Sequence, residues 1–291
     1  MQVAKTIAEI RALVAQARAA GKTVGFVPTM GALHTGHASL IDAARGRCGC
    51  VVVSIFVNPT QFGPTEDLNK YPRPFEKDLK VCEKHGVDAI FAPTVAQMYP
   101  RENLTWVNVE RLTDRLCGRS RPGHFRGVAT VCTKLFNIVC PDVAFFGQKD
   151  AQQALVIRRM VADLNAPLEI VVCPTVREPD GLAMSSRNQY LSPGERKDAA
   201  QIYKSLQRCR ELIEAGQRDA ELIRTRMREV LQRVPSTSVE YISLSDAETL
   251  EELQEVRGRV LAAVAVRMKS ARLIDNILVD TTAKQATIRS F

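Results

Sequence analysis

The fold is decided by residues 23–45, TVGFVPTMGALHTGHASLIDAAR. The first six residues are mostly apolar and are typical of a buried strand, and the segment after His37 has the apolar spacing of a helix. The turn between them, from Pro28 to His37, therefore follows the carboxyl end of a strand. Ligands bind at that end of the strands in open α/β sheets. We therefore expect a ligand at this turn.

Four more apolar, β-branched runs follow, and helix-length segments separate most of them. The five predicted strands are residues 23–28, 50–58, 87–93, 142–147 and 168–173. Alternation of this kind predicts an α/β fold in which helices flank a parallel sheet. Before the first strand, the apolar spacing from Val3 to Ala17 predicts a helix with Gly21 at its C-terminal end.

The pattern changes after Val176, where residues 177–196 contain few apolar side chains and two turn signals. We place a domain boundary here, which gives domains of residues 1–176 and 177–291. The second domain is predicted to be a small α+β unit with helices over 194–215 and 217–234 and strands over 238–244, 259–268 and 271–279. The closing residues 281–291 lack apolar spacing and are predicted to form a loose tail.

Composition narrows the class of protein. With 291 residues and 45% hydrophobic content, the chain can bury a sizeable core. It has no apolar run of the roughly 20 residues that a membrane span needs, so we expect a cytoplasmic protein without membrane contact. The net charge of +8 is spread along the chain, which argues against a nucleic-acid partner and suits an anionic small molecule.

The eight cysteines lie singly in apolar segments, as buried thiols do, and are expected to be reduced. Cys48 and Cys50 form a C-x-C pair without a second pair or a nearby histidine, so no zinc site is expected there.

His34 and His37 stand at the start of the helix that follows the first strand, beside Gly31 and Gly36. Glycines allow close backbone approach, and the unpaired N–H groups of a helix N-terminus bind phosphate. The alternatives are a zinc site, which lacks a third ligand, and a purely structural pair. The G-K-T sequence that begins at Gly21 is not the end of a P-loop, because it precedes a strand instead of following one. The Rossmann fingerprint G-x-G-x-x-G does not occur in the sequence.

Two further segments suit phosphate binding. MSSRN, residues 184–188, places a guanidinium behind two hydroxyls, a set that suits a triphosphate. FFGQKDAQQ, residues 145–153, places Lys149 where a predicted strand passes into a helix. Alone, the first would be an ordinary loop and the second a solvated lysine.

Two segments offer polar contacts of other kinds. SIFVNPTQF, residues 54–62, ends the second predicted strand with the amides of Asn58 and Gln61, which can fix a polar substrate or simply form a turn. RSRPGHFR, residues 119–126, can bind anions or form a solvated loop. The sequence leaves both alternatives open.

Taken in order, these segments resemble a known family. HTGH resembles the HxGH signature of the adenylyl-transferring superfamily, and MSSR resembles its KMSKS-type loop. Together with FVNPTQF, RPGHFRGV and FNIVCPDVAFFGQKD, they make the chain similar to the pantoate-β-alanine ligase family along nearly its whole length. The resemblance implies a Rossmann-like N-terminal domain, a smaller C-terminal lid domain, a homodimer, and ATP with Mg²⁺.

The resemblance also implies roles for residues. Catalytic roles fall on His34, His37, Lys149 and Arg187. Pantoate or β-alanine binding falls on Asn58, Gln61 and Gln153, whereas Arg121 and His124 receive no definite role. ATP binding falls on Met30, Gly31, Ala32, Leu33, His34, Thr35, Gly36, His37, Gly147, Gln148, Lys149, Asp150, Val176, Met184, Ser185, Ser186 and Arg187. No protein ligand to a metal is implied, because Mg²⁺ is held mainly by the ATP phosphates.

Two positions depart from the family pattern: Gln148, where glutamate is frequent, and Ala151, where a bulkier residue is usual. Gln148 is among the residues to which the resemblance gives ATP binding, whereas Ala151 has no assigned role. Neither position carries a catalytic role, so the expected chemistry is unchanged.

The implied activity is the ATP-dependent condensation of pantoate with β-alanine through a pantoyl adenylate, which yields pantothenate, AMP and pyrophosphate. The rivals are a nucleotidyltransferase of the same superfamily, an aminoacyl-tRNA synthetase, and a nucleic-acid-binding protein without catalysis. The synthetase would need a basic RNA-binding surface, which the sequence does not show.

Overall fold

The computed structural model describes residues 1–64, 66–234, 236–282 and 287–288. The chain divides into two compact units. Unit 1 comprises Met1–Asp114, Gly118–Gly147 and Gln152–Cys173, and unit 2 comprises Arg115–Cys117, Gln148–Ala151 and Pro174–Phe291. The main division thus falls between residues 173 and 174, and two short segments that precede this division belong to unit 2.

Unit 1 contains a six-stranded sheet in the order β1-β4-β3-β2-β5-β6, and all its strand pairs are parallel. The strands are β1 (Gln2–Ala4), β2 (Val24–Thr29), β3 (Cys50–Ile55), β4 (Ala89–Phe91), β5 (Val143–Gly147) and β6 (Glu169–Cys173). The chain runs from β2 to β3 and β4 on one side and continues through β5 and β6 on the other. The strand order therefore reverses between β2 and β5, and ligands bind at such a point in open α/β sheets.

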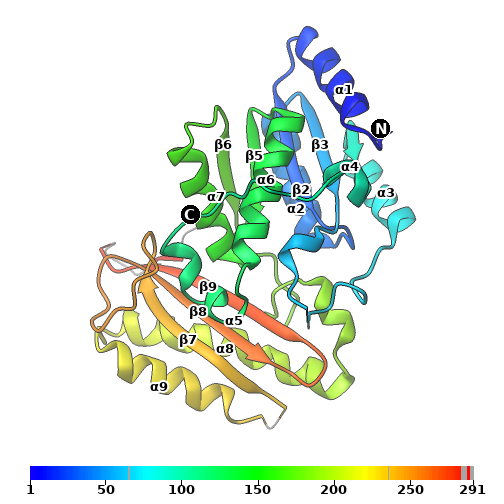
Figure 1. The fold of residues 1–291 in the computed structure, drawn as a ribbon. Helices are drawn as coiled ribbons and strands as arrows, with labels where there is room; N and C mark the ends of the chain where they lie inside the picture. The colour runs from blue at the N-terminus through cyan, green and yellow to red at the C-terminus, as the bar shows by residue number, and fades with distance from the viewer. Residues whose placement is uncertain (65, 235, 283–286, 289–291) are drawn as a thin grey trace. The chain divides into compact units, whose positions relative to one another are not determined.

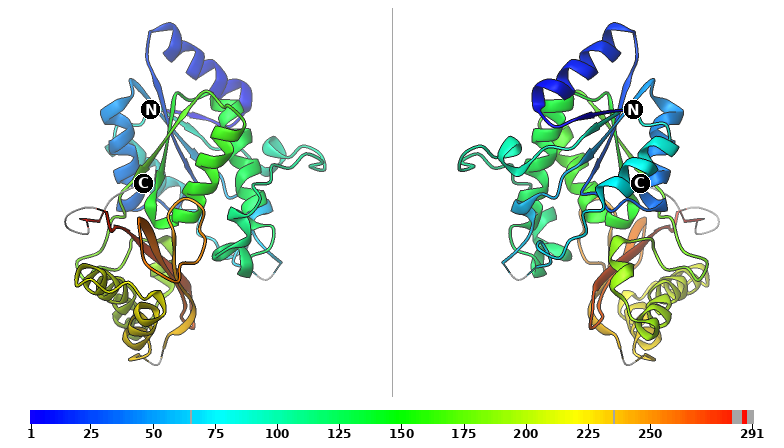
Figure 2. Two further views of the ribbon diagram at one scale, coloured as in Figure 1. Left: turned by 90° about the vertical axis from the view of Figure 1, so that its left-hand side faces the viewer. Right: turned by 90° about the vertical axis from the view of Figure 1, so that its right-hand side faces the viewer.

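Helices cover both faces of this sheet (Figures 1 and 2). On one face α2 (Thr35–Arg47) packs beside α3 (Phe75–Lys84), and on the other α1 (Ile7–Ala19) packs beside α6 (His124–Val139). Helix α7 (Ala151–Asp163) leads from β5 to β6. The remaining short elements are η1 (Pro59–Gln61), α4 (Val95–Met98), η2 (Leu112–Asp114), α5 (Cys117–Ser120) and η3 (Gln148–Asp150). The predicted α/β class with a parallel sheet is confirmed.

One strand of unit 1 was not predicted. Val3, expected on the first helix, lies instead in β1, which pairs with β4 at the sheet edge. The helix begins at Ile7 because Thr6 and Glu9 form a capping box: the Thr6 side chain accepts from the Glu9 N–H, and Glu9 accepts from the Thr6 N–H. Gly21, with φ +71°, follows the C-terminal end of this helix as predicted.

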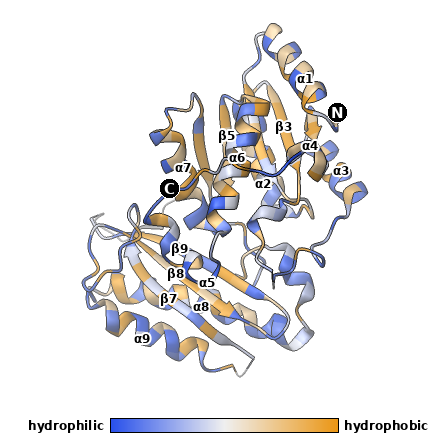
Figure 3. Cartoon of the chain, in the orientation of Figure 1, coloured by the Kyte–Doolittle hydropathy of each residue, from blue (hydrophilic) through white to orange (hydrophobic). Residues whose placement is uncertain are grey.

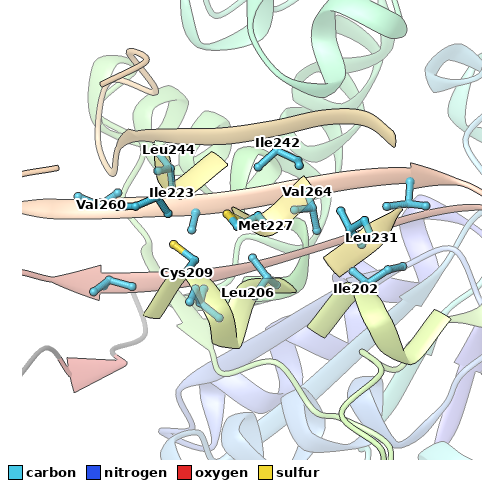
Figure 4. Close-up of a cluster of buried hydrophobic side chains, with 14 of the residues drawn as sticks. Ile202, Leu206, Cys209, Ile223, Met227, Leu231, Ile242, Leu244, Val260 and Val264 are labelled. Atoms are coloured by element: carbon cyan, nitrogen blue, oxygen red, sulfur yellow. The ribbon is translucent and has the colours of Figure 1, made fainter. Parts of the chain in front are cut away.

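Unit 2 packs two helices, α8 (Pro193–Glu214) and α9 (Ala220–Leu231), on an antiparallel sheet. The sheet order is β10-β9-β8-β7, with β7 (Ser238–Asp246), β8 (Arg259–Arg267), β9 (Arg272–Asp280) and β10 (Thr287–Ile288). Apolar side chains of both helices meet those of the strands, so unit 2 has its own core (Figure 4). Figure 3 shows apolar strands and mixed helices, the pattern of sheets covered by amphipathic helices. The predicted α+β character is confirmed.

The loose tail predicted over 281–291 is wrong for residues 287–288, which pair antiparallel with β9 as β10. Residues 283–286 and 289–291 lie outside the described residues. All eight cysteines are described, and all are thiols without a disulfide; only Cys140 is exposed. Within the described part of the chain, no helix is long and apolar enough to cross a membrane.

Candidate active site

The turn after β2 is held by a carboxylate that the sequence analysis missed. Asp78 on α3 accepts hydrogen bonds from the N–H groups of Ala32, at 2.9 Å, and Leu33, at 2.7 Å. Burial raises the pKa of Asp78, although these two hydrogen bonds oppose the rise. Gly31 has φ +85°, and a Cβ there would lie 3.0 Å from Asp78 Oδ2, so glycine is required at this position.

The two histidines of HTGH cap α2 in place of the usual Ser and Glu. His34 is the N-cap residue, and its Nδ1 accepts from the Gly36 N–H at 3.1 Å. The Nδ1 of His37 accepts from the His34 N–H at 3.3 Å, and the ring centroids lie 4.1 Å apart. Because both Nδ1 atoms accept, the proton of each neutral imidazole lies on Nε2. Both rings are therefore Nε2–H donors at a helix N-terminus, where an anion is favoured.

Asn58 and Gln61 lie next to this turn, around η1. Asn58 is buried, and its Nδ2 donates to Gln61 Oε1 at 3.1 Å and to the Gly127 carbonyl at 3.3 Å. Gln61 Nε2 in turn donates to the Sδ of Met30 at 3.1 Å. A thioether is a weak acceptor, so a substrate oxygen can replace it at little cost. The structure thus brings Met30, Asn58 and Gln61 together, and Tyr99, whose hydroxyl donates to Asn58 Oδ1, completes the group.

Arg121 and His124 support the main chain at Gln61. Arg121 donates through Nε and Nη2 to both oxygens of Glu66, each at 2.6 Å, and its Nη1 lies 3.0 Å from His124 Nε2. His124 Nδ1 lies 2.8 Å from the main-chain oxygen of Gln61. A carbonyl can only accept, so His124 donates from Nδ1 and accepts at Nε2. Burial works against the charge of Glu66, but Arg121 lowers the pKa of Glu66 below its usual value.

The end of β5 supplies the remaining predicted residues of unit 1. Gly147 is the last residue of β5, and a Cβ there would meet nothing within 4 Å, so its surroundings are open. Gln153 lies half-buried in the first turn of α7, which starts close behind. Gly147 ends β5, the strand that neighbours β2 where the sheet order reverses, and Gln153 follows it.

Unit 2 holds the other predicted ATP residues. Gln148, Lys149 and Asp150 form η3, in which Lys149 Nζ lies 3.7 Å from Asp150 Oδ1. The Met184 N–H donates to the Val176 carbonyl at 2.9 Å.

Beyond Met184, Ser185 caps the short helix η4 (Ser186–Tyr190) by accepting from the Arg187 N–H. The predicted residues therefore form two groups: one in unit 1 around β2, η1 and the end of β5, and one in unit 2 around η3 and η4. No group of three potential metal-ligating side chains occurs among the described residues.

A parallel sheet whose order reverses beside an HTGH turn, together with an MSSR segment, defines an α/β nucleotide-dependent enzyme of the HxGH class. Comparison with known proteins narrows the class. The family model described as pantoate-beta-alanine ligase matches residues 2–278. The chain therefore belongs to the pantoate-β-alanine ligase family, and it is a ligase.

The relatives agree along almost the full chain. It is 55% identical to a pantothenate synthetase of Pelotomaculum thermopropionicum over 278 residues, which cover 96% of this chain and 99% of that protein. It resembles the crystal structure of pantothenate synthetase from Thermus thermophilus with a TM-score of 0.91 and 48% identity, covering 95% and 98% of the two chains.

A third relative carries ligands. The pantoate-beta-alanine ligase of Francisella tularensis, complexed with beta-gamma ATP and β-alanine, is 33% identical with a TM-score of 0.78, covering 97% of this chain and 98% of that one. The expected activity, ATP-dependent condensation of pantoate with β-alanine, is confirmed by these matches.

Proposed function

We propose that the residues of unit 1 and unit 2 described above carry out this condensation through a pantoyl adenylate. The observation that carries the proposal is the pair of imidazoles at the start of α2, both held with Nε2 as the hydrogen-bond donor. Two fixed donors at a helix N-terminus suit the polyphosphate of ATP.

The first step is an in-line displacement at the α-phosphorus of ATP. A carboxylate oxygen of pantoate forms the new P–O bond, and the bond to the pyrophosphate oxygen breaks. Negative charge grows on the leaving group, so Lys149 and Arg187 stabilise it as cations while His34 and His37 stabilise it as neutral donors. Asn58, Gln61 and Gln153 hold the hydroxyl and carboxylate groups of pantoate.

In the second step the free amine of β-alanine attacks the carbonyl carbon of the adenylate. The amide bond forms, the bond from carbon to the phosphate oxygen breaks, AMP leaves, and the amine nitrogen loses a proton. The acyl group is already activated, so no cysteine or serine nucleophile is needed.

Unit 2, with residues 177–291 as its main part, is proposed to act as the lid domain, and residues 1–176 as the domain that binds ATP and pantoate. We also propose a homodimer in the cytoplasm. Mg²⁺ enters with ATP: this ion keeps several waters and is usually bound through substrate phosphates, where it offsets their charge.

The test measures pyrophosphate and AMP released from Mg-ATP and pantoate, with and without β-alanine. Pyrophosphate should form with pantoate alone in an amount close to that of the enzyme, and AMP should accumulate over many turnovers only when β-alanine is added. A stable dinucleotide-like product would indicate a nucleotidyltransferase. Absence of any pantoate-dependent pyrophosphate would refute the proposal.

A further inference from the structure

Two adjacent residues of β9, Asp275 and Asn276, hold parts of unit 2 that are far away in the sequence. Both side chains are buried, at 3% and 4% exposure. Asn276 Nδ2 donates to the main-chain oxygens of Gln148 and Lys149, both at 2.9 Å. One amide group therefore fixes two successive carbonyls of η3.

Those two hydrogen bonds determine the direction in which the Lys149 side chain extends from the backbone. The direction of a side chain follows from the dihedral angles of its own residue, and two anchored carbonyls leave η3 little freedom to rotate. The Lys149 side chain is itself only 20% exposed. Asn276 thus sets the position of the backbone from which the Lys149 side chain extends.

Asp275 holds the second segment through Arg177. Arg177 donates from Nη1 to Asp275 Oδ2 at 2.6 Å and from Nη2 to Oδ1 at 3.0 Å. Its Nη1 also donates to the Gly181 carbonyl at 3.0 Å, and its guanidinium stacks on the Tyr203 ring at 3.9 Å. Arg177 is therefore fixed on three sides.

Arg177 begins the hairpin that leads to the MSSR segment. It forms an antiparallel bridge with Ala183, and the hydrogen bond from Met184 to Val176 continues the pairing. Ser185 and Arg187 follow directly. The anchored guanidinium thus fixes the near end of the segment that carries the second phosphate-binding set.

Asp275 and Asn276 are linked by a hydrogen bond within β9 and by the electrostatic interaction of Asp275 with Lys149. The Asn276 N–H donates to Asp275 Oδ1 at 2.8 Å. Burial raises the pKa of Asp275, and the hydrogen bonds and charge of Arg177 and the charge of Lys149 oppose that rise. The carboxylate therefore interacts electrostatically with both segments that it and its neighbour hold.

We propose that Asp275 and Asn276 are positioning residues of the ligase reaction: Asn276 orients Lys149, and Asp275, through Arg177, orients the segment from Met184 to Arg187. The inference rests on the ATP roles proposed above for those two segments. It assigns to β9, which no motif singled out, the alignment of the phosphate-binding side chains in unit 2.

Hydrogen–deuterium exchange of the protein alone tests the anchoring without reference to activity. Asn276→Leu keeps the size of the side chain but removes both donors, so exchange in residues 148–152 should rise at least tenfold while residues 176–187 stay near wild type. Asp275→Asn should show the reverse pattern. Asp280→Asn, a buried carboxylate on the same strand, should change neither segment.

Single-turnover adenylate formation tests the role in the reaction. Both variants should slow it by about 10- to 100-fold, the cost of misplacing a reacting or charged group by about 1 Å. The half-saturating pantoate concentration should stay within twofold, because the proposed pantoate residues lie in unit 1. A general loss of structure would not separate the two quantities in this way. Asn276→Ser, which keeps one donor, serves if Asn276→Leu does not fold, and should give an intermediate rate.

Folded variants that form adenylate at the wild-type rate, or that raise exchange equally in both segments, overturn the inference. Wild-type protein that forms no adenylate from pantoate refutes the proposed function instead, and the exchange pattern still decides whether Asp275 and Asn276 anchor the two segments.

Discussion

Lys149 is one of the two cations proposed to stabilise the leaving pyrophosphate. Its ammonium group lies 3.7 Å from Asp150, its main-chain oxygen is held by Asn276, and its side chain is mostly covered. A cation fixed in advance stabilises developing charge without reorganising, and this is why such groups contribute strongly to catalysis.

Replacing Lys149 by methionine keeps most of the side-chain volume and removes the charge. We expect pantoyl adenylate formation in a single turnover to slow by about a hundredfold or more, as on loss of one preorganised partner. Rapid-quench measurement of pyrophosphate checks this. Lys204→Met, at an exposed position on α8, serves as the control and should react at the wild-type rate. Near-wild-type speed in Lys149→Met would remove this residue from the mechanism.

The thiols are expected to differ sharply in reactivity. Cys140 is exposed, whereas the other seven are buried, and burial raises the pKa of Cys82, Cys132 and Cys209 to about 12. Only thiolates react quickly, so an aromatic disulfide reagent should label about one thiol per folded chain quickly and all eight after unfolding. Cys140→Ser should abolish the fast phase. A fast phase that survives in Cys140→Ser would show that a second thiol is accessible.

Sequence reasoning at this scale proposed the residues that contact the substrates but missed the residues that hold those side chains in place. The motifs HTGH and MSSRN, and the segment that contains Lys149, can each be recognised from a few consecutive residues. Asp78 lies 46 positions from Ala32, and Asn276 lies 127 positions from Lys149, so neither pairing leaves a local pattern. Asp78 gave one sign, a carboxylate on the apolar face of its helix near Leu79 and Cys82.

Among the elements, η1 and α6 depend on a single glycine for their contact. A Cβ at Gly127 would lie 2.3 Å from the Thr60 carbonyl oxygen and 2.8 Å from the Gln61 Cα. Both are backbone atoms, so the segment that carries Asn58 and Gln61 would have to move. The approach of the helix therefore sets the position of the proposed pantoate amides.

Gly127→Ala should lower the free energy of unfolding by about 1–3 kcal/mol, the usual cost of overpacking, and raise the KM for pantoate. Urea unfolding and initial rates measure the two effects. Gly46→Ala is the matched control, because this exposed glycine of α2 has no atom within 4 Å of its Cβ position and should become slightly more stable through higher helix propensity. An unchanged KM in Gly127→Ala would contradict the proposed link to pantoate.

The first turn of α8 contains Glu195, a carboxylate whose pKa is strongly lowered. Glu195 accepts from the Ser192 N–H at 2.9 Å and from the N–H and hydroxyl of Ser270 at 3.0 and 2.8 Å. The backbone hydrogen bond from Ser192 and the Ser270 hydroxyl lower the pKa of Glu195 to about 2, from 4.5 in an unfolded chain. The ionised form is thus favoured by folding.

Because the pKa of Glu195 is lower in the folded state, its contribution to stability is fully present above pH 4.5 and is lost as the pH falls toward 2. Glu195→Gln should therefore be less stable than wild type at pH 6, and the difference should shrink below pH 4.5. Denaturant unfolding at several pH values measures this. Glu211→Gln, an exposed carboxylate of the same helix, should show little difference at any pH, and a pH-independent loss in Glu195→Gln would contradict the argument.

The prediction of elements succeeded where apolar periodicity is strong. Strands β2 to β6 of unit 1 and the helices α8 and α9 and strands β7, β8 and β9 of unit 2 were all foreseen. The strand β1 is only three residues long and its first two residues are exposed, so its apolar pattern merges with that of the following helix. Local capping at Thr6, and not hydrophobic spacing, separates the two.

At the scale of the whole molecule, the predicted ATP residues are divided between two units, each with its own core. The sequence indicated two domains from the loss of apolar spacing after Val176. It could not show that residues 115–117 and 148–151 belong to the second unit, because that membership depends on contacts with strands made more than a hundred positions later.

Ligand-induced thermal shifts test the proposed division of labour, since a ligand stabilises only the fold that binds it. The shift produced by Mg-ATP should shrink in both His37→Ala, in unit 1, and Arg187→Ala, in unit 2. The shift produced by pantoate should shrink in Gln61→Ala and persist in Arg187→Ala. An unchanged ATP shift in Arg187→Ala would mean that unit 2 does not contribute to ATP binding through this residue.

The membership of residues 148–151 in unit 2 also has a consequence for how the protein is made. The chain on either side of them belongs to unit 1, and their partner Asn276 follows 127 positions after Lys149. At roughly 5–20 residues per second, a ribosome needs roughly 6–25 s to cover that distance. During this interval the parallel sheet of unit 1 can already assemble on the nascent chain. Residues 148–151 cannot yet pair with β9, because that strand has not been synthesised. The framework of unit 1 can therefore form before unit 2 acquires its proposed phosphate-binding geometry.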